Sequence, residues 1–206
     1  ADLTYNTVSL ATEVFHLNIG LIASYCNEKF GDKIEITLFK YIDELDNAIS
    51  ENPPDILGLS NYCWNHKVGA ELFGMLKKIN PSAVTVWGGP NFPLDMPSQH
   101  EFMKEYHQVD SYIPVEGEVG FANIVERVLE CESKETIHNI LSESTIDGVI
   151  SRDINGNLQY SNPAARIKEL DEIPSPYTSG LMDKFFDGKL IPMLQTNRGC
   201  PFSCTF

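Results

Sequence analysis

Basic residues are scarce in this chain. Its 206 residues include 15 Lys and Arg against 29 Asp and Glu, which leaves a formal net charge of −14. A surface this acidic repels phosphate backbones, so a nucleic-acid partner is not expected. No apolar run approaches the roughly 18 residues that cross a bilayer, so a membrane partner is not expected either. The first residues, Ala1 to Asn6, lack the basic and apolar regions of a signal peptide.

Cysteine is also scarce, and three of the five cysteines are isolated along the chain: Cys26, Cys63 and Cys131. An odd, scattered set does not form a disulfide framework, and it favours a reducing cytoplasmic location. Phosphate-binding glycine loops, nucleophile elbows and zinc-protease motifs are missing. With 42% hydrophobic and 21% charged residues, the composition is that of an ordinary globular protein.

The first two-thirds of the chain alternates short apolar segments with segments of helical period. We expect strands over residues 5–10, 34–39, 56–60, 83–87 and 111–115. Apolar stripes starting at Val68 and Phe121 repeat every three or four residues, as in helices that pack on a sheet. This α/β alternation predicts a doubly wound, five-stranded parallel sheet of flavodoxin-like type over residues 1–131. Such sheets bind ligands beyond the carboxyl ends of their strands.

The pattern changes after residue 131. The turn sequence Asn155-Gly156 between two short apolar runs predicts a β-hairpin. Pro174 and Pro176 then favour an extended, semi-rigid linker. We therefore assign residues 132–189 to a hairpin and linker. A last apolar run over residues 190–194 predicts a strand that opens a further region, 190–206.

Two cysteines stand three residues apart near the end of the chain. Paired thiolates bind zinc or iron–sulfur clusters. Zinc sites usually use a two-residue gap, so the wider spacing of Cys200 and Cys204 fits a cluster better. On spacing alone, two small buried side chains are an equally good explanation.

The sequence from Arg198 to Phe206, RGCPFSCTF, resembles the cluster loop of radical S-adenosylmethionine enzymes. In that family three cysteines hold a 4Fe-4S cluster, and S-adenosylmethionine chelates the remaining iron. The resemblance implies that Cys200 and Cys204 are cluster ligands and that Phe206 lies near the adenine. The family's third cysteine is not among the 206 residues, so we expect a fragment cut within the loop. We expect it to hold no stable cluster by itself, with the rest of the barrel following in cis.

Three stretches upstream resemble the cobalamin-dependent branch of that superfamily: residues 54–62, residues 86–91, and residues 115–118 followed by Phe121. The resemblance implies a cobalamin-binding region, monomeric or weakly dimeric. In the full-length enzyme it implies methyl transfer to a carbon or related radical chemistry. The residues implied to surround the cofactor are Ser60, Asn61, Tyr62, Trp64, Gly88, Gly89, Pro90, Asn91, Gly117 and Glu118.

The loop after the first expected strand should also face the corrin through Thr12, Glu13, Val14, Phe15 and His16. Cobalamin domains that ligate cobalt through histidine place an aspartate two residues before it, where this chain has Val14. His16 is therefore a weak axial-ligand candidate, and a histidine at a helix start is the simpler explanation.

Ordinary structural roles compete with several of these assignments. Ser60 and Asn61 could cap the next helix, and Gly88-Gly89 could be a plain tight turn. Glu118 could simply interact favourably with the dipole of the helix that it begins. The rival function is a degenerate scaffold or substrate-docking domain without cobalamin. It is favoured if Tyr62, Trp64 or Phe15 fills the crevice. A receiver or nucleotide-binding domain is a weaker alternative, because neither acidic cluster nor G-x-G-x-x-G is present.

Overall fold

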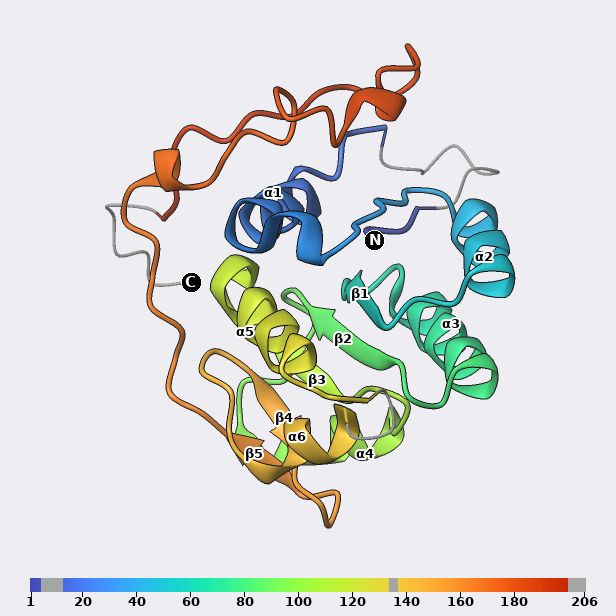
Figure 1. Cartoon of the computed structure of the whole chain (residues 1–206), viewed down its shortest axis with the longest axis vertical. Coiled ribbons are helices and arrows are strands. Elements are labelled where there is room, and N and C mark those ends of the chain that lie inside the picture. The colour runs from blue at the N-terminus through green and yellow to red at the C-terminus, as the bar shows by residue number, and fades with distance from the viewer. Residues whose placement is uncertain (5–12, 134–136, 200–206) are drawn as a thin grey trace.

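The computed structural model describes residues 1–4, 13–133 and 137–199, and its centre is a five-stranded sheet in the order β1-β2-β3-β4-β5 (Figure 1). The strands are β1 Ile56–Ser60, β2 Val84–Gly88, β3 Ser111–Ile113, β4 Ile150–Arg152 and β5 Leu158–Tyr160. The first three are parallel, and β4 and β5 are antiparallel to their neighbours. The predicted α/β class with five strands is confirmed.

Helices cover both faces of the sheet. They are α1 Leu17–Phe30, α2 Ile42–Glu51, α3 His66–Ile79, α4 Met96–Glu105, α5 Gly117–Leu129 and α6 Ile137–Glu143. Successive residues of a strand point to opposite faces. Leu57 and Trp87 therefore join the core under α2, α3 and α4, whereas Val84 and Val86 join the core under α5 and α6. This double coverage explains why the parallel strands read as continuous apolar runs.

Two of the five strands are not those that the alternation predicted. The hairpin around Asn155-Gly156 forms as predicted, but β4 pairs onto β3 and so completes the same sheet. Residues 34–39 form no strand in the described structure. The nearest pairing is the isolated parallel bridge between Thr4 and Tyr41, and the apolar side chains of residues 34–38 pack toward α1. The expected strand over residues 5–10 lies outside the described residues.

The N-terminal residues nevertheless lie where a flavodoxin-like sheet has its first strand. Ser60 N donates to Ala1 O at 2.9 Å, and Thr4 N donates to Lys40 O at 3.2 Å. Residues 1–4 thus lie between β1 and residues 40–41. This arrangement places the switch in strand order beside β1, at the edge where ligands bind in such sheets.

The C-terminal segment (residues 161–199) runs around the outside of the sheet and across α1 (Figure 1). The extended, semi-rigid linker expected around Pro174 and Pro176 is packed against α1. Met182 and Pro176 close on Gly20 of α1 so tightly that a Cβ there would lie 2.7 Å from the Met182 sulfur. The run over 190–194 forms only one isolated bridge, between Ile191 and Val14. No helix in the described part of the chain is long and apolar enough to cross a bilayer.

Candidate functional site at the carboxyl edge of the sheet

The three parallel strands end at Ser60, Gly88 and Ile113, and the loops that follow them share one edge of the sheet. Parallel strands bring their carboxyl ends together, so residues from distant parts of the sequence meet there. The predicted site residues from 60 to 118 all lie in or beside these loops.

A buried amide holds the turn after β2. The Asn61 side chain donates to Asn91 O at 2.8 Å and to the Tyr112 hydroxyl at 3.2 Å, and it accepts from Asn91 Nδ2 at 3.1 Å. The Tyr112 hydroxyl in turn donates to Gly89 O at 2.7 Å. Asn61 is fully buried and these partners satisfy it, so it holds the turn in place and does not itself face a ligand.

Gly89 requires its glycine. Its φ is +125°, and a Cβ would lie 2.8 Å from Asn61 O. L-residues rarely adopt that conformation, and no side chain fits against the neighbouring backbone. The turn therefore combines a tight bend with a close backbone approach, and it leaves Pro90 exposed and Asn91 partly exposed.

The end of β1 has a second polar network. Ser60 Oγ donates to Asp2 Oδ1 at 2.5 Å and accepts from Asn65 Nδ2 at 3.2 Å. Asn65 Oδ1 accepts from Tyr62 N at 2.8 Å, and Asn65 is the N-cap of α3. No side chain of this loop caps α3 by a hydrogen bond, so the capping role considered for Ser60 and Asn61 is not observed, and Ser60 instead joins Asp2 to Asn65.

Large apolar side chains are exposed on every loop that follows a parallel strand. Trp64 after β1 is 51% exposed, Leu94 after β2 is 99% exposed, and Val115 after β3 is 80% exposed. Trp64 also stacks on Tyr62 with ring centroids 4.5 Å apart and an interplanar angle of 6°. Each of the three loops at the carboxyl edge of the sheet thus presents one large apolar side chain to solvent.

The loop ahead of α1 is more buried than predicted. Phe15 packs against Tyr177, Phe185 and Phe186 of the C-terminal segment, with centroids 5.7, 6.3 and 4.8 Å away. The ring therefore faces this aromatic cluster, whereas Glu13 is exposed and Val14 is half-buried. Phe15 was expected to face the corrin, and its burial under the C-terminal segment changes that assignment.

His16 is the N-cap of α1, as its simpler explanation predicted. Its ring contacts Phe185 with centroids 4.2 Å apart, and neither ring nitrogen has a hydrogen-bond partner among the described residues. Burial, helped by the positive charge of Lys40, lowers the pKa of His16 to about 3. The imidazole is therefore neutral, and no carboxylate orients it.

The start of α5 receives the last described residues of the chain. Glu118 binds the Arg198 guanidinium in a bidentate pair, with Nη1–Oε2 at 3.1 Å and Nη2–Oε1 at 2.5 Å. These bonds raise the pKa of Arg198, so it stays charged. Gly117 packs against Ile22 of α1, where a Cβ would lie 2.5 Å from Cδ1. Glu118 therefore has a specific partner beyond the helix dipole.

The structure thus brings together the predicted residues from β1, β2 and α5, and it adds Asp2, Asn65, Tyr112 and Arg198. Of these, only Arg198 had a sequence signal, as the first residue of the motif RGCPFSCTF. Thr12, Cys200, Cys204 and Phe206 lie outside the described residues. Within residues 1–4, 13–133 and 137–199, no group of three or more His, Cys, Asp or Glu could hold a metal ion.

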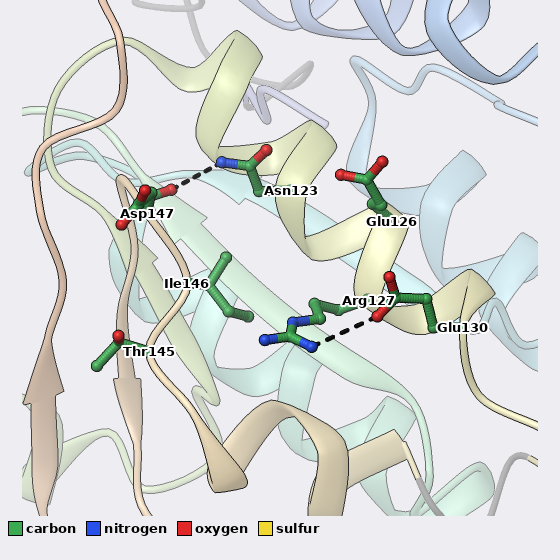
Figure 2. A pocket seen from close by; sticks show the side chains of 7 residues that line it. All are labelled: Asn123, Glu126, Arg127, Glu130, Thr145, Ile146 and Asp147. Carbon is green, nitrogen blue, oxygen red and sulfur yellow. Dashed lines mark hydrogen bonds and ion pairs between the residues drawn. The ribbon is translucent and has the colours of Figure 1, made fainter.

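A shallow depression of about 360 Å³ lies elsewhere, between α5 and residues 145–147 (Figure 2). Its walls are polar: Asn123 donates to Asp147 O at 3.0 Å, and Arg127 lies 3.4 Å from Glu130. These groups bond one another, so the depression has no unsatisfied group aimed at a ligand.

Comparison with known proteins gives two kinds of match, although no protein-family model matches the chain. It is 31% identical over 172 residues to 2-(S-pantetheinyl)-carbapenam-3-carboxylate methyltransferase of Streptantibioticus cattleyicolor. It is equally similar to the cobalamin-dependent radical SAM methyltransferase TokK of Streptomyces tokunonensis. In both cases the match covers 80% of this chain and 23% of the relative.

The chain is homologous to cobalamin-dependent radical S-adenosylmethionine methyltransferases. It spans about a quarter of the length of these two relatives. Among solved structures, the cobalamin-dependent S-adenosylmethionine radical enzyme OxsB with aqua-cobalamin and S-adenosylmethionine bound superposes with a TM-score of 0.65 at 18% identity. That match covers 98% of this chain and 27% of OxsB, and it shows that the two proteins share a fold over this region.

Proposed function

We propose that this chain binds cobalamin at the carboxyl edge of its sheet, as the cobalamin-binding region of a radical S-adenosylmethionine methyltransferase. The observation that carries the proposal is the exposed apolar group on every loop after a parallel strand: Trp64, Leu94 and Val115. A corrin ring is broad and largely apolar, and it would cover such a surface. The homology to cobalamin-dependent methyltransferases supports the same ligand.

The polar edge between these groups would hold the more polar parts of the cofactor. Gly88 and Gly89 let the strands and the Asn61 backbone pack closely, and Asn61 fixes the turn so that Pro90 and Asn91 would face the cofactor. The Ser60 hydroxyl lies at the end of β1 and gives its proton to Asp2, so a nucleotide tail would reach its oxygen as a hydrogen-bond donor. Tyr62 and Trp64 offer a stacked aromatic face.

Cobalt receives no protein histidine in this proposal. His16 is buried beneath Phe185 and lacks an orienting carboxylate, so it does not fit an axial ligand. Glu13 and Val14 are the residues of that loop that remain accessible to a cofactor. When bound, cobalamin would supply the methyl group, and the chain would position it and exclude water.

The 4Fe-4S cluster and S-adenosylmethionine belong to the complete enzyme in this proposal. Cys200 and Cys204 would be two of the cluster ligands, and Phe206 would contact the adenine. The 206-residue chain should then bind cobalamin without catalysing methyl transfer.

Hydroxocobalamin binding tests the proposal directly. The purified chain is mixed with hydroxocobalamin, passed through gel filtration and examined by visible spectroscopy. We expect cobalamin to co-elute in a 1:1 ratio, and a colourless protein peak contradicts the proposal. Trp64→Ser should weaken binding about tenfold, which corresponds to about 1.4 kcal/mol. The control is Leu129→Ser, which removes an exposed apolar group at the opposite end of α5.

The second candidate is a scaffold that has lost cobalamin binding. The burial of Phe15 in an aromatic cluster of the C-terminal segment favours it, because the loop that should face the corrin is covered. Trp64 favours the first candidate, because it is exposed and fills no crevice. The hydroxocobalamin experiment separates the two.

A further inference from the structure

We infer that Arg198 is a positioning residue that fixes the start of the cysteine loop against the helix α5. Its role rests on the proposed function, in which this edge holds cobalamin and Cys200 holds part of the cluster. The pair Arg198–Glu118 would then set where the cluster lies relative to the corrin.

The pair is unusually well formed for residues 80 positions apart. Two parallel hydrogen bonds join the guanidinium to the carboxylate, and the Glu118 and Arg198 side chains are only 4% and 14% exposed. Bidentate geometry fixes orientation as well as distance. A surface ion pair between flexible side chains would give neither.

The burial of Glu118 requires this partner. A glutamate in the first turn of a helix already benefits from the helix dipole, and it can do so while exposed. Here the carboxylate is buried instead, and a buried charge needs a partner of opposite sign. The arrangement therefore serves the docking of Arg198 and not the start of α5.

A second acidic residue reinforces the contact. Glu116, the N-cap of α5, lies 4.0 Å from Arg198 Nη1 and 3.0 Å from Arg166 Nε. Gly199 lies beside Arg166, since a Cβ on Gly199 would be 3.4 Å from Arg166 Nη2. Arg166 is 64% exposed and lies at the rim of the contact, whereas Arg198 is the arginine that is buried in it.

The cysteine loop begins only two residues after Arg198 in the sequence. Two residues of extended chain reach at most about 7 Å, so we expect an anchored Arg198 to limit how far the second residue after it can move. The other end of the contact, α5, starts at the edge where Gly89 and Val115 lie. One ion pair therefore relates the two proposed cofactor sites.

Hydrogen exchange of the 206-residue chain tests the positioning without any cofactor. Arg198→Met should raise the exchange of the hydrogen-bonded amides of Ile191 and Met193 about tenfold, because the segment that ends at Arg198 is released locally. Arg166→Met is the matched control, since it removes the more exposed arginine of the same network, and exchange should change less than about twofold. Unchanged exchange in Arg198→Met overturns the inference.

A double variant separates positioning from stability. Arg198→Met leaves Glu118 buried without its partner, so the thermal midpoint should fall. Adding Glu118→Gln removes the buried charge and should restore the midpoint, while exchange at Ile191 and Met193 stays fast. If exchange becomes slow again in the double variant, Arg198 is only a counter-charge and the inference fails.

The complete enzyme provides a readout that keeps the inference distinct from the proposed function. Arg198→Met should raise the ratio of 5′-deoxyadenosine formed to methyl groups transferred, while its affinity for hydroxocobalamin stays within about twofold of wild type. An unchanged ratio contradicts the inference. Wild-type protein that binds no hydroxocobalamin contradicts the proposed function instead. The hydrogen-exchange result then still tests the role of Arg198 independently.

Discussion

The sheet with its covering helices and the C-terminal segment (residues 161–199) are held in place by different means. The sheet is stabilised by apolar packing on both faces, with Trp87 and Phe73 fully buried at its centre. The C-terminal segment has almost no regular structure and is attached at separate contacts, chiefly Phe185 and Arg198. Stability should therefore concentrate in the sheet, and release should be possible in the segment without unfolding the rest.

The largest expected effect lies in the sheet. Trp87→Ala should lower the free energy of unfolding by about 3–5 kcal/mol, because it empties a fully buried site between α3 and α4. Trp64→Ala is the matched control, because that indole is half-exposed and its loss should cost well under about 1 kcal/mol. Urea unfolding followed by circular dichroism measures both. Equal losses in the two variants would contradict the assignment of Trp87 to the core.

The next effect tests attachment of the C-terminal segment. Phe185→Ala removes a buried ring that contacts Phe15 and His16, and it should cost roughly 2–3 kcal/mol, since the segment can detach instead of leaving a cavity. Proteolysis within residues 175–194 should become faster while the sheet stays folded. The neighbouring Phe186→Ala is the control, because Phe186 is mostly exposed. If proteolysis of the sheet accelerates equally, the two regions are one cooperative unit.

A change in the backbone of the turn after β2 should also lower the free energy of unfolding. Gly89→Ala should destabilise the protein by about 2 kcal/mol, because the residue has φ +125° and no room for a Cβ beside Asn61 O. Gly74→Ala in α3 is the control with the opposite sign, since that position is helical and open, and it should stabilise by about 0.5–1 kcal/mol. Thermal unfolding of the two variants would show the difference.

At neutral pH the smallest effect is a dependence on pH at the junction of the two regions, and it grows as the pH falls. The pKa of His16 is lowered to about 3, below the ordinary value of 6.5, so only the unfolded chain takes up this proton as the pH falls below 6.5. As the pH falls from 6.5 to 3, this residue should therefore lower the free energy of unfolding by about 1.4 kcal/mol per pH unit. Above pH 6.5 this loss is absent.

His16→Leu should remove that part of the slope, measured as the urea midpoint at pH 7, 6 and 5. His100→Gln is the control, because His100 is exposed on α4. A slope that persists unchanged in His16→Leu would show that the acid sensitivity arises elsewhere.

Much of the sheet could be predicted from sequence, because its signals are local. β1 has the predicted bounds, and β2 and β3 differ from prediction by no more than two residues at either end, since each is a short apolar run between turn residues. The hairpin followed from Asn155-Gly156 alone. That β4 pairs with β3 could not be predicted, because antiparallel addition to a parallel sheet depends on contacts between residues about 40 positions apart.

The site was less predictable than the fold. Strand ends located Ser60, Asn61 and Gly89 at one edge, but their partners Asp2, near the N-terminus, and Tyr112, in β3, are distant in sequence, and no local pattern reveals these pairings. Phe15 and His16 became buried because the C-terminal segment packs on them, and no local pattern predicts that contact. Arg198 was visible only as part of a motif, and its partner Glu118 was not.

The closure of the β4–β5 hairpin has a practical consequence for engineering. Gly148 N donates to Asn162 O at 2.8 Å, so the chain enters and leaves the hairpin at bonded neighbours. The tip at Gly156 is open, with no atom near a hypothetical Cβ. A fluorescent or affinity tag inserted at this tip should lengthen the hairpin loop without disturbing the segment that leads to Arg198. The tag would lie far from the edge proposed to hold the corrin.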